Sequence, residues 1–170
     1  FPFGLYKNSP YWVPPIISEE LRVFDNTKNP ILKDAEVKLF LAYKNNAIVG
    51  RIAAIANWIE INEQNVKKMR FGWFDFIDDL SVSRALLEKI SEIGNIHNLK
   101  YMEGPVGFSN LDKVGVLTHG FDVIGTMISW YNHPYYAAHL ETHNFSVEKE
   151  YLEYKHAFSD IKIEKFKRLS

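Results

Sequence analysis

Two carboxylates in neighbouring predicted strands have the chemistry of proton acceptors. Asp75 lies inside the otherwise aromatic segment FGWFDF, and Glu103 ends the apolar segment YME. A carboxylate within an apolar strand must face solvent, a partner or a cleft, because burying it alone is costly. We therefore predict Asp75, with Glu103 as a second candidate, as a general base that accepts a proton during a reaction. The alternative is that both carboxylates are merely exposed at strand ends.

The turn between that strand and the next helix is a potential phosphate site with an unusual charge. A helix N-terminus presents unpaired backbone N–H groups, which often bind phosphate. Here the turn contains Asp78 and Asp79, which repel an anion, and Ser81, which can donate hydrogen bonds. The alternative is structural, with Asp79 or Ser81 capping the helix by accepting hydrogen bonds from its first N–H groups.

A glycine-rich loop, GPVGFSNLDKVGVLTHGFD, follows the second strand. Glycines between apolar residues permit close backbone approach, and the polar side chains among them can converge on a small ligand. The predicted substrate-binding residues are Ser109, Asn110, Asp112 and His119. A long connection whose glycines only satisfy turn geometry is the alternative.

Three histidines in or beside one predicted helix raise the question of a metal site. His139 and His143 have the i, i+4 spacing that two zinc ligands can use, and His133 precedes them. The order HLETH differs from the zinc motif H-E-x-x-H, because its Glu follows Leu rather than the first His. We therefore predict no metal.

The elements that position these residues indicate a mixed sheet with helices on its faces. VKLFLAYK and AIVGRIAAIANW flank Asn45 and Asn46, which favour the left-handed turn of a hairpin. FGWFDFID and YMEGPV are typical of strands joined by an amphipathic helix, in which apolar residues recur at helical spacing. Such a unit makes its two strands parallel.

Further elements are predicted on both sides of this unit. A short helix fits residues 18–24, between the prolines of the first thirty residues. Asn132 is predicted to cap a helix over HPYYAAHLETHN, VIGTMISWYN to form a strand or its approach, and FSVEKEYLEYKHAF to form the last strand. We expect one domain over 1–158, with a proline-rich and aromatic arm at 1–30, and a tail or linker at 159–170.

The composition limits the possible partners. With 170 residues, 46% hydrophobic content and a formal charge of -1, the chain is typical of one globular domain without a general nucleic-acid or anionic-membrane surface. The absence of cysteine excludes disulfides, thiolate metal sites and a Cys nucleophile. We expect a cytoplasmic protein. The chain lacks an initiator Met and opens on FPFGLYKNSPYWVPPI, so we expect it to be a fragment of a longer chain.

This order of elements, together with several phrases, resembles the GNAT N-acetyltransferase superfamily, and more narrowly an uncharacterised bacterial group of GNAT-like proteins. The phrases are GRIAAI, FDFIDD, GPVGFSNLD, HGFD, YNHPYY and YYAAHLETHNF, and they cover nearly the whole chain. The resemblance implies an α/β (α+β) fold of the acyl-CoA N-acyltransferase type. Its sheet would be mixed and mostly antiparallel, with a central parallel strand pair and helices on both faces.

The resemblance also implies acetyl-CoA or another acyl-CoA as acyl donor and a small-molecule amine as acceptor. In the family, an R-x-x-G-x-G or -A loop before a helix holds the pyrophosphate of CoA, and its signature positions fall here on Asp78, Ser81 and Ser83. The residues that the resemblance assigns to CoA binding are Phe76, Ile77, Asp78, Ser81, Val82, Ser83, Arg84, Asn132, Tyr135 and Tyr136.

Acyl transfer from CoA also needs an acid that protonates the CoA thiolate as it leaves. In many GNAT enzymes it is a tyrosine one residue before the Glu of the last helix, but here Leu140 precedes Glu141. The resemblance therefore transfers the role to Tyr136, one helical turn earlier on the same face, or to Tyr135. Aromatic packing of the helix on the sheet is the alternative.

A second function stays open beside acyl transfer. The aspartates at the pyrophosphate turn favour a catalytically degenerate GNAT-like domain that binds another small molecule through the glycine-rich loop. Such a domain could equally be one structural half of a larger protein, or one copy in a homodimer.

Overall fold

A four-stranded mixed sheet forms the centre of the protein. The computed structural model describes residues 1–109, 111–126 and 129–157. The strands are β1 (Ala35–Lys44), β2 (Ala47–Asn57), β3 (Lys68–Phe76) and β4 (Tyr101–Glu103), in the order β1-β2-β3-β4. β2 pairs antiparallel with β1 and β3, whereas β3 and β4 are parallel. The parallel pair lies at one edge rather than at the centre, because no strand pairs with the far side of β4 among the described residues.

The predicted hairpin and crossover are confirmed. β1 and β2 meet at Asn45 and Asn46, whose φ angles of 50° and 62° place both in the left-handed conformation that asparagine tolerates. β3 leads into α3 (Leu80–Ile96), which crosses to the parallel strand β4. The fold is therefore a mixed α+β arrangement, as predicted at this coarser level.

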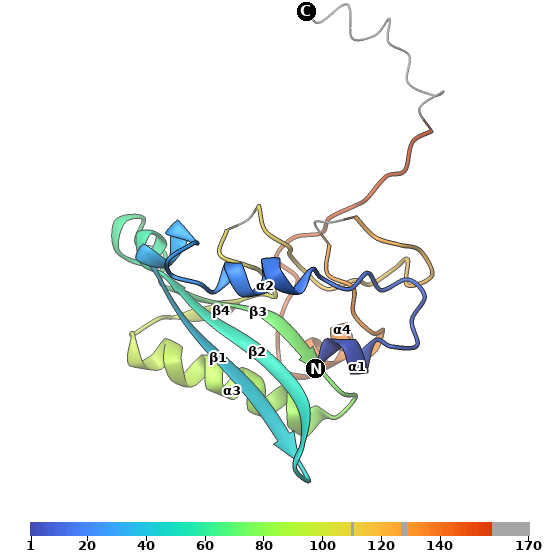
Figure 1. Ribbon diagram of the computed structural model, residues 1–170. Helices are drawn as coiled ribbons and strands as arrows, with labels where there is room; N and C mark the ends of the chain where they lie inside the picture. The colour runs from blue at the N-terminus through green and yellow to red at the C-terminus, as the bar shows by residue number, and fades with distance from the viewer. Residues whose placement is uncertain (110, 127–128, 158–170) are drawn as a thin grey trace, which may run out of the picture.

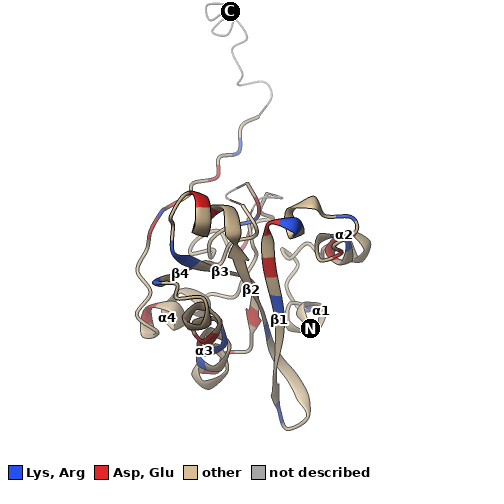
Figure 2. Ribbon diagram, turned by 90° about the vertical axis from the view of Figure 1, so that its left-hand side faces the viewer, with Lys and Arg blue, Asp and Glu red and all other residues tan. Residues whose placement is uncertain are grey.

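Helices lie on both faces of the sheet. Figure 1 shows α2 (Ile17–Val23) crossing the strands on one face and α3 on the other, and Figure 2 shows the same layers from the side. The remaining elements are α1 (Pro2–Leu5), α4 (Tyr135–Thr142), the 3-10 helix η1 (Pro30–Lys33) and the π-helix η2 (Ile59–Glu63). The short helix predicted over 18–24 corresponds to α2.

The two faces of the sheet carry separate apolar clusters. The larger cluster joins Phe71, Phe74 and Phe76 of β3 to α3 and α4. The smaller cluster, on the α2 side, includes Trp73. A β-bulge in β3 lets its side chains reach both clusters. Gly72 pairs with Ala53 and Asp75 pairs with Arg51, so β3 has one extra residue between these pairs. Within the bulge, Trp73 has a positive φ of 47°. The bulge places both Trp73 and Asp75 on the face away from α3.

Several predicted elements in the second half of the chain differ from the structure. YMEGPV is a strand only over Tyr101–Glu103, and described residues of VIGTMISWYN contribute an isolated bridge at Ser129 rather than a strand. Asn132 does not cap α4, since Pro134 stands at that position and the Asn132 side chain instead binds both backbone groups of Leu117. Residues 145–157 are largely exposed and form no strand.

Gly72 allows the chain after β4 to pack directly against β3. A Cβ atom at Gly72 would lie 2.5 Å from the backbone oxygen of Val106, a contact that only a backbone shift can relieve. We expect Gly72→Ala to lower the free energy of unfolding by about 1–3 kcal/mol, as overpacking usually does. Urea denaturation measures the change.

Gly94→Ala is the matched control for this substitution. Its Cβ would meet Met69 at an ordinary 3.5 Å, and alanine favours the helical conformation of α3. We expect this variant to be as stable as the parent or more so. Equal destabilisation by the two variants would contradict the close approach at Gly72.

Candidate active site

The last residue of β3, Phe76, lies opposite Gly50 of β2 and is also hydrogen-bonded by two tyrosines. The amide N–H of Phe76 donates to Tyr136 Oη at 3.2 Å, and Tyr135 Oη–H donates to the Phe76 carbonyl at 2.5 Å. Tyr136 is almost fully buried, and its ring lies against the Phe76 ring with centroids 4.3 Å apart. α4 therefore closes the edge of β3 that β4 leaves open.

A chain of hydrogen bonds leads from this edge to Asp75. The hydroxyl oxygens of Tyr136 and Tyr6 are 2.8 Å apart, and Tyr6 Oη–H donates to Asp75 Oδ1 at 2.7 Å. Because the proton of Tyr6 points to Asp75, the proton of Tyr136 must point to Tyr6. The structure thus brings together the predicted base, Asp75, and the predicted acid, Tyr136, through Tyr6 of the N-terminal arm.

The other oxygen of Asp75 is paired with a cation. Arg51 lies opposite Asp75 in the β2–β3 register, and its Nε–H donates to Asp75 Oδ2 at 2.6 Å. The Asp75 side chain is only 11% exposed, compared with 25% for Arg51. The arginine therefore compensates the carboxylate inside an aromatic strand, and each carboxylate oxygen keeps a lone pair for a further proton donor.

The tyrosine hydroxyls of this network stay protonated. Burial, and then the negative charge of Asp75, raise the pKa of both Tyr6 and Tyr136 far above its usual value. Burial, followed by the charges of Asp78 and Asp75, raises the pKa of Tyr135 in the same direction. These hydroxyls can pass protons as donors, but they do not act as tyrosinate bases at neutral pH.

A small cavity lies where the chain leaves β3. β3 and β4 share only three residue pairs, from Lys68–Tyr101 to Arg70–Glu103, and the Val106 amide then reaches the Phe71 carbonyl. Beyond this point Asp75 and Tyr136 line a cavity of about 10 Å³, closed by residues 115–116 and 130–132. That volume holds roughly one water molecule, so a larger group needs these segments to move away from β3.

The N-terminus of α3 is capped internally. Asp79 Oδ1 accepts the Ser81 amide at 2.9 Å and the Ser81 hydroxyl at 2.6 Å, while its Oδ2 accepts the Lys44 ammonium at 2.6 Å. Asp79 thus has the capping role that the sequence left open. A phosphate at this turn would have to displace Asp79 from the same two donors.

The ion pair of Asp79 predicts a pH dependence of stability. The hydrogen bond from Lys44, and then those from Ser81, hold the pKa of Asp79 well below its usual range. Since the folded-state pKa is lower than the unfolded one, the stabilisation is present above about pH 4 and is lost as the pH falls below it. We expect Asp79→Asn, which keeps the cap oxygen, to flatten the fall in unfolding free energy between pH 5 and pH 2.

The comparison for Asp79→Asn is Glu63→Gln, which neutralises an exposed carboxylate on η2. Urea denaturation at a series of pH values should give parallel curves for Glu63→Gln and the parent. A curve for Asp79→Asn that also parallels the parent would mean that the Lys44 pair is not linked to folding.

Four further side chains at this end form a polar cluster, in which Ser83 and His139 are buried and Asp78 is exposed. Ser83 Oγ lies 2.9 Å from His139 Nδ1 and 2.8 Å from His143 Nε2, and His139 Nε2 lies 2.9 Å from Asp78 Oδ1. Burial, and then the positive charge of Arg84, lower the pKa of His143. Ser83 is fully buried, so it ties α3 to α4 and cannot meet a phosphate as the family alignment implied.

The remaining predicted CoA ligands are mostly engaged within the protein. The Ile77 amide donates to the Val49 carbonyl, and the Val82 amide donates to the Asp79 carbonyl. Arg84 is exposed on the first turns of α3 and could supply a positive charge. Asn132 is buried in its contact with Leu117.

Glu103 does not share the site with Asp75. Its carboxylate lies 2.6 Å from Lys68 Nζ at the opposite end of β3, in a cluster that also contains Glu60 and Arg70. Glu103 is opposite Arg70 in the strand register, whereas Asp75 is five residues further along β3. Glu103 therefore lies apart from the network of Asp75, and its role as an alternative base stays a prediction.

The polar residues of the glycine-rich loop only partly converge. Asp112 Oδ2 accepts the Ser109 amide at 2.8 Å, and both residues line one cleft on the α2 face. His119 is exposed, bonds to Thr118 and does not line that cleft. Asn110 lies outside the described residues.

Sequence reasoning missed Tyr6 and Arg51. Tyr6 lies in an arm whose aromatics predicted only general packing, and no periodicity connects it to β3. Arg51 had a usable signal, since an arginine within the apolar strand IVGRIAAIA needs a carboxylate partner, and the strand register offers Asp75. Within the described part of the chain, no helix has the length and apolarity that a membrane crossing requires.

Comparisons with known proteins give two relatives. The chain is 30% identical over 141 residues to Protein YghO of Escherichia coli (strain K12), covering 83% of this chain and 36% of that protein. It is 26% identical over 157 residues to a protein of Caulobacter vibrioides (strain NA1000 / CB15N) named bacterial ceramide synthase, covering 91% of this chain and 40% of that protein. The chain thus spans less than half the length of either relative. Neither a known family profile nor a solved structure matches it.

Proposed function

We propose that the chain is the catalytic part of a GNAT-like N-acyltransferase, which moves an acyl group from a CoA thioester to an amine. The observation that carries the proposal is the hydrogen-bonded series Asp75, Tyr6 and Tyr136 beside the cavity at the end of β3 that β4 does not reach. The relative named ceramide synthase supports the reaction type, because a ceramide is the N-acyl amide of a long-chain amine.

The network supplies a route for the one proton that the reaction moves. The neutral amine attacks the thioester carbonyl, the new C–N bond forms and the C–S bond breaks, with its electron pair leaving on sulfur. The hydroxyls of Tyr6 and Tyr136 first turn their protons toward Tyr136 and the sulfur. Tyr136 then protonates the sulfur, Tyr6 passes its proton to Tyr136, and Asp75 passes to Tyr6 the proton that its Oδ1 takes from the amine nitrogen. Each group returns to its starting protonation state, and the products are an amide and free CoA thiol.

Arg51 positions the first group of this proton route. Its guanidinium orients the Asp75 carboxylate between reactions through Oδ2, while Oδ1 stays hydrogen-bonded to Tyr6. The raised pKa of Tyr136 keeps its hydroxyl protonated until a thiolate forms nearby.

The donor site is tested by direct binding. Calorimetry and thermal unfolding with acetyl-CoA and longer acyl-CoAs should show binding, with about 2.7 kcal/mol of added stability at one hundred times the dissociation constant. Arg84→Gln should weaken binding severalfold, because it removes the exposed cation on the first turns of α3. Lys89→Gln, further along the same helix and paired with Glu92, is the control. Absence of binding for every donor would reject the proposal for those donors.

A second function is favoured by the capped turn. Asp79 already occupies the amide and hydroxyl of Ser81, which suits a GNAT-like domain that binds a different small molecule without CoA. Retained binding of an amine without any CoA response would support this alternative.

A further inference from the structure

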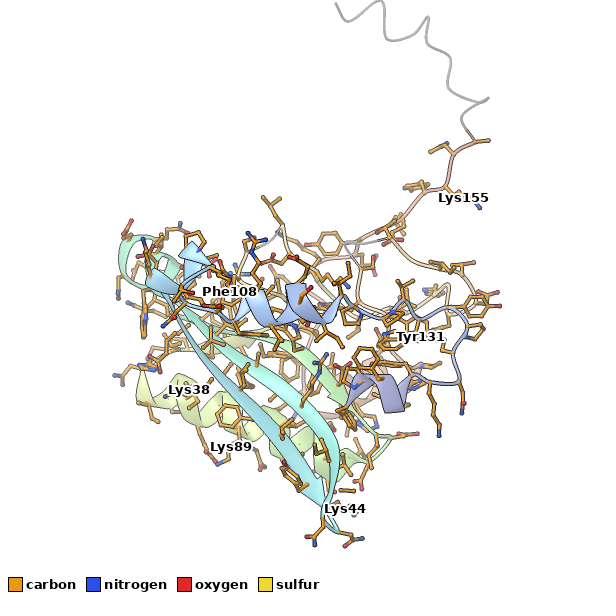
Figure 3. The ribbon with its side chains drawn as sticks, in the orientation of Figure 1. Lys38, Lys44, Lys89, Phe108, Tyr131 and Lys155 are labelled. Atoms are coloured by element: carbon orange, nitrogen blue, oxygen red, sulfur yellow. The ribbon has the colours of Figure 1, made fainter. Side chains whose placement is uncertain are left out.

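A cleft of about 270 Å³ lies on the sheet face opposite α3. It runs between α2 and residues 107–109 and 112–113, and Figure 3 shows Phe108 beside α2 at this position. Its size is at the small end of the range for ligand pockets, roughly 300–1,000 Å³. The network of Asp75 and the tyrosines does not use this space.

Three aromatic rings form the apolar wall of the cleft. The Trp73 ring lies 6.0 Å from Phe108 and 5.7 Å from Trp130, centroid to centroid, and both contacts are edge-to-face. The bulge in β3 directs Trp73 to this side. Trp130 also lines the cavity that contains Asp75, so the cleft and the proposed reaction centre share one side chain.

The charged groups of the cleft favour a cation at one point. The Glu20 carboxylate accepts the Trp73 indole N–H at 2.8 Å, and within the described residues no Lys, Arg or His forms an ion pair with it. Asp112 is engaged by Ser109 and also faces the Arg70 guanidinium. Of the two carboxylates in the cleft, Glu20 is therefore the one whose negative charge is not paired with a cationic side chain among the described residues.

Lys113 shows that an ammonium group fits against this wall. Its Nζ lies 5.3 Å from the centre of the Trp130 ring, in a cation–π position. A carboxylate together with aromatic faces is the arrangement that recognises organic ammonium ions. The protein already satisfies part of that arrangement with its own side chain.

We propose that this cleft binds a primary amine with an apolar body, its ammonium group near Glu20 and its body against Trp73, Phe108 and Trp130. That this amine is the acceptor of acyl transfer rests on the function proposed above, whereas its binding does not. From the cleft, the amine reaches Asp75 by passing Trp130, releases its extra proton to solvent on the way and attacks as the neutral amine.

The test uses n-octylamine, n-octanol and octanoate as probes, with binding measured by calorimetry and tryptophan fluorescence near pH 7. We expect octylamine to bind at least tenfold more tightly than octanol or octanoate. Glu20→Gln keeps an acceptor for the Trp73 indole and should abolish that preference. Glu19→Gln, the exposed neighbour on α2, should leave it intact. Lys113→Gln should tighten octylamine binding about threefold, because the face of Trp130 becomes free.

Equal binding of the three probes, or equal behaviour of Glu20→Gln and Glu19→Gln, would overturn the proposal. Acyl-CoA binding, measured separately on the same samples, distinguishes the two ideas. Octylamine preference without CoA binding leaves the cleft assigned and rejects acyl transfer. CoA binding without octylamine preference does the reverse.

Discussion

Tyr136→Phe is expected to lower kcat for acyl transfer by about 10²- to 10³-fold, because it removes the hydroxyl that protonates the leaving thiolate. The ring contact with Phe76 would remain, so the KM for the acyl donor should change little. Free thiol measured by a colorimetric reagent reports the rate. The protein itself adds no background, since its sequence has no cysteine.

Two comparisons make this result specific. Tyr6→Phe should cause a similar loss, and the double variant should be no worse than either single one, since residues that act as one unit are not additive. Tyr101→Phe, at an exposed position on β4, should retain activity. Full activity in Tyr136→Phe would remove this tyrosine from the proton route.

Asp75→Asn is expected to lower kcat by about 10²- to 10⁴-fold and also to destabilise the fold. An amide cannot accept the amine proton. Asparagine also has only one side-chain oxygen, so its NH₂ group would replace an accepting oxygen in the contact with either Tyr6 or Arg51. Breaking a mostly buried, hydrogen-bonded ion pair should lower the free energy of unfolding by about 2–3 kcal/mol. Activity and urea denaturation measure the two effects.

Arg51→Gln distinguishes the contribution of the Asp75–Arg51 pair to stability from the contribution of Asp75 to catalysis. Combined with Asp75→Asn, it removes the uncompensated cation, so the double variant should be more stable than the sum of the single losses predicts. Catalysis should not recover, because the proton acceptor is still missing. Recovery of activity in the double variant would show that Asp75 only orients other groups.

The local elements around the site were predictable from short-range patterns. The Asn45–Asn46 turn and the apolar spacing of α3 each depend on neighbouring residues, and both are confirmed. Asp75, predicted from a carboxylate inside an apolar strand, and Tyr136, predicted from the family resemblance, lie in one hydrogen-bonded network, and their catalytic roles stay predictions.

The long-range parts were not predictable in the same way. Tyr6 joins Asp75 across sixty-nine positions, and a proline-punctuated arm has no periodicity that could indicate such a contact. The separation of Glu103 from Asp75 was not predictable either, because it depends on the shortness of β4, whose end lies beside Arg70. Ser83 carried a signal in the sequence, since it precedes Leu87 by four residues and thus shares the buried face of α3.

The most direct test is amine-dependent release of thiol from an acyl-CoA, measured with n-octylamine and compared between the parent protein and Tyr136→Phe. We expect the parent protein to release thiol and to form the N-octyl amide in equal amounts. We expect Tyr136→Phe to be slower by at least about a hundredfold. Release that does not depend on the amine, no amide product, or an unchanged rate in Tyr136→Phe would contradict acyl transfer through the Asp75, Tyr6 and Tyr136 network.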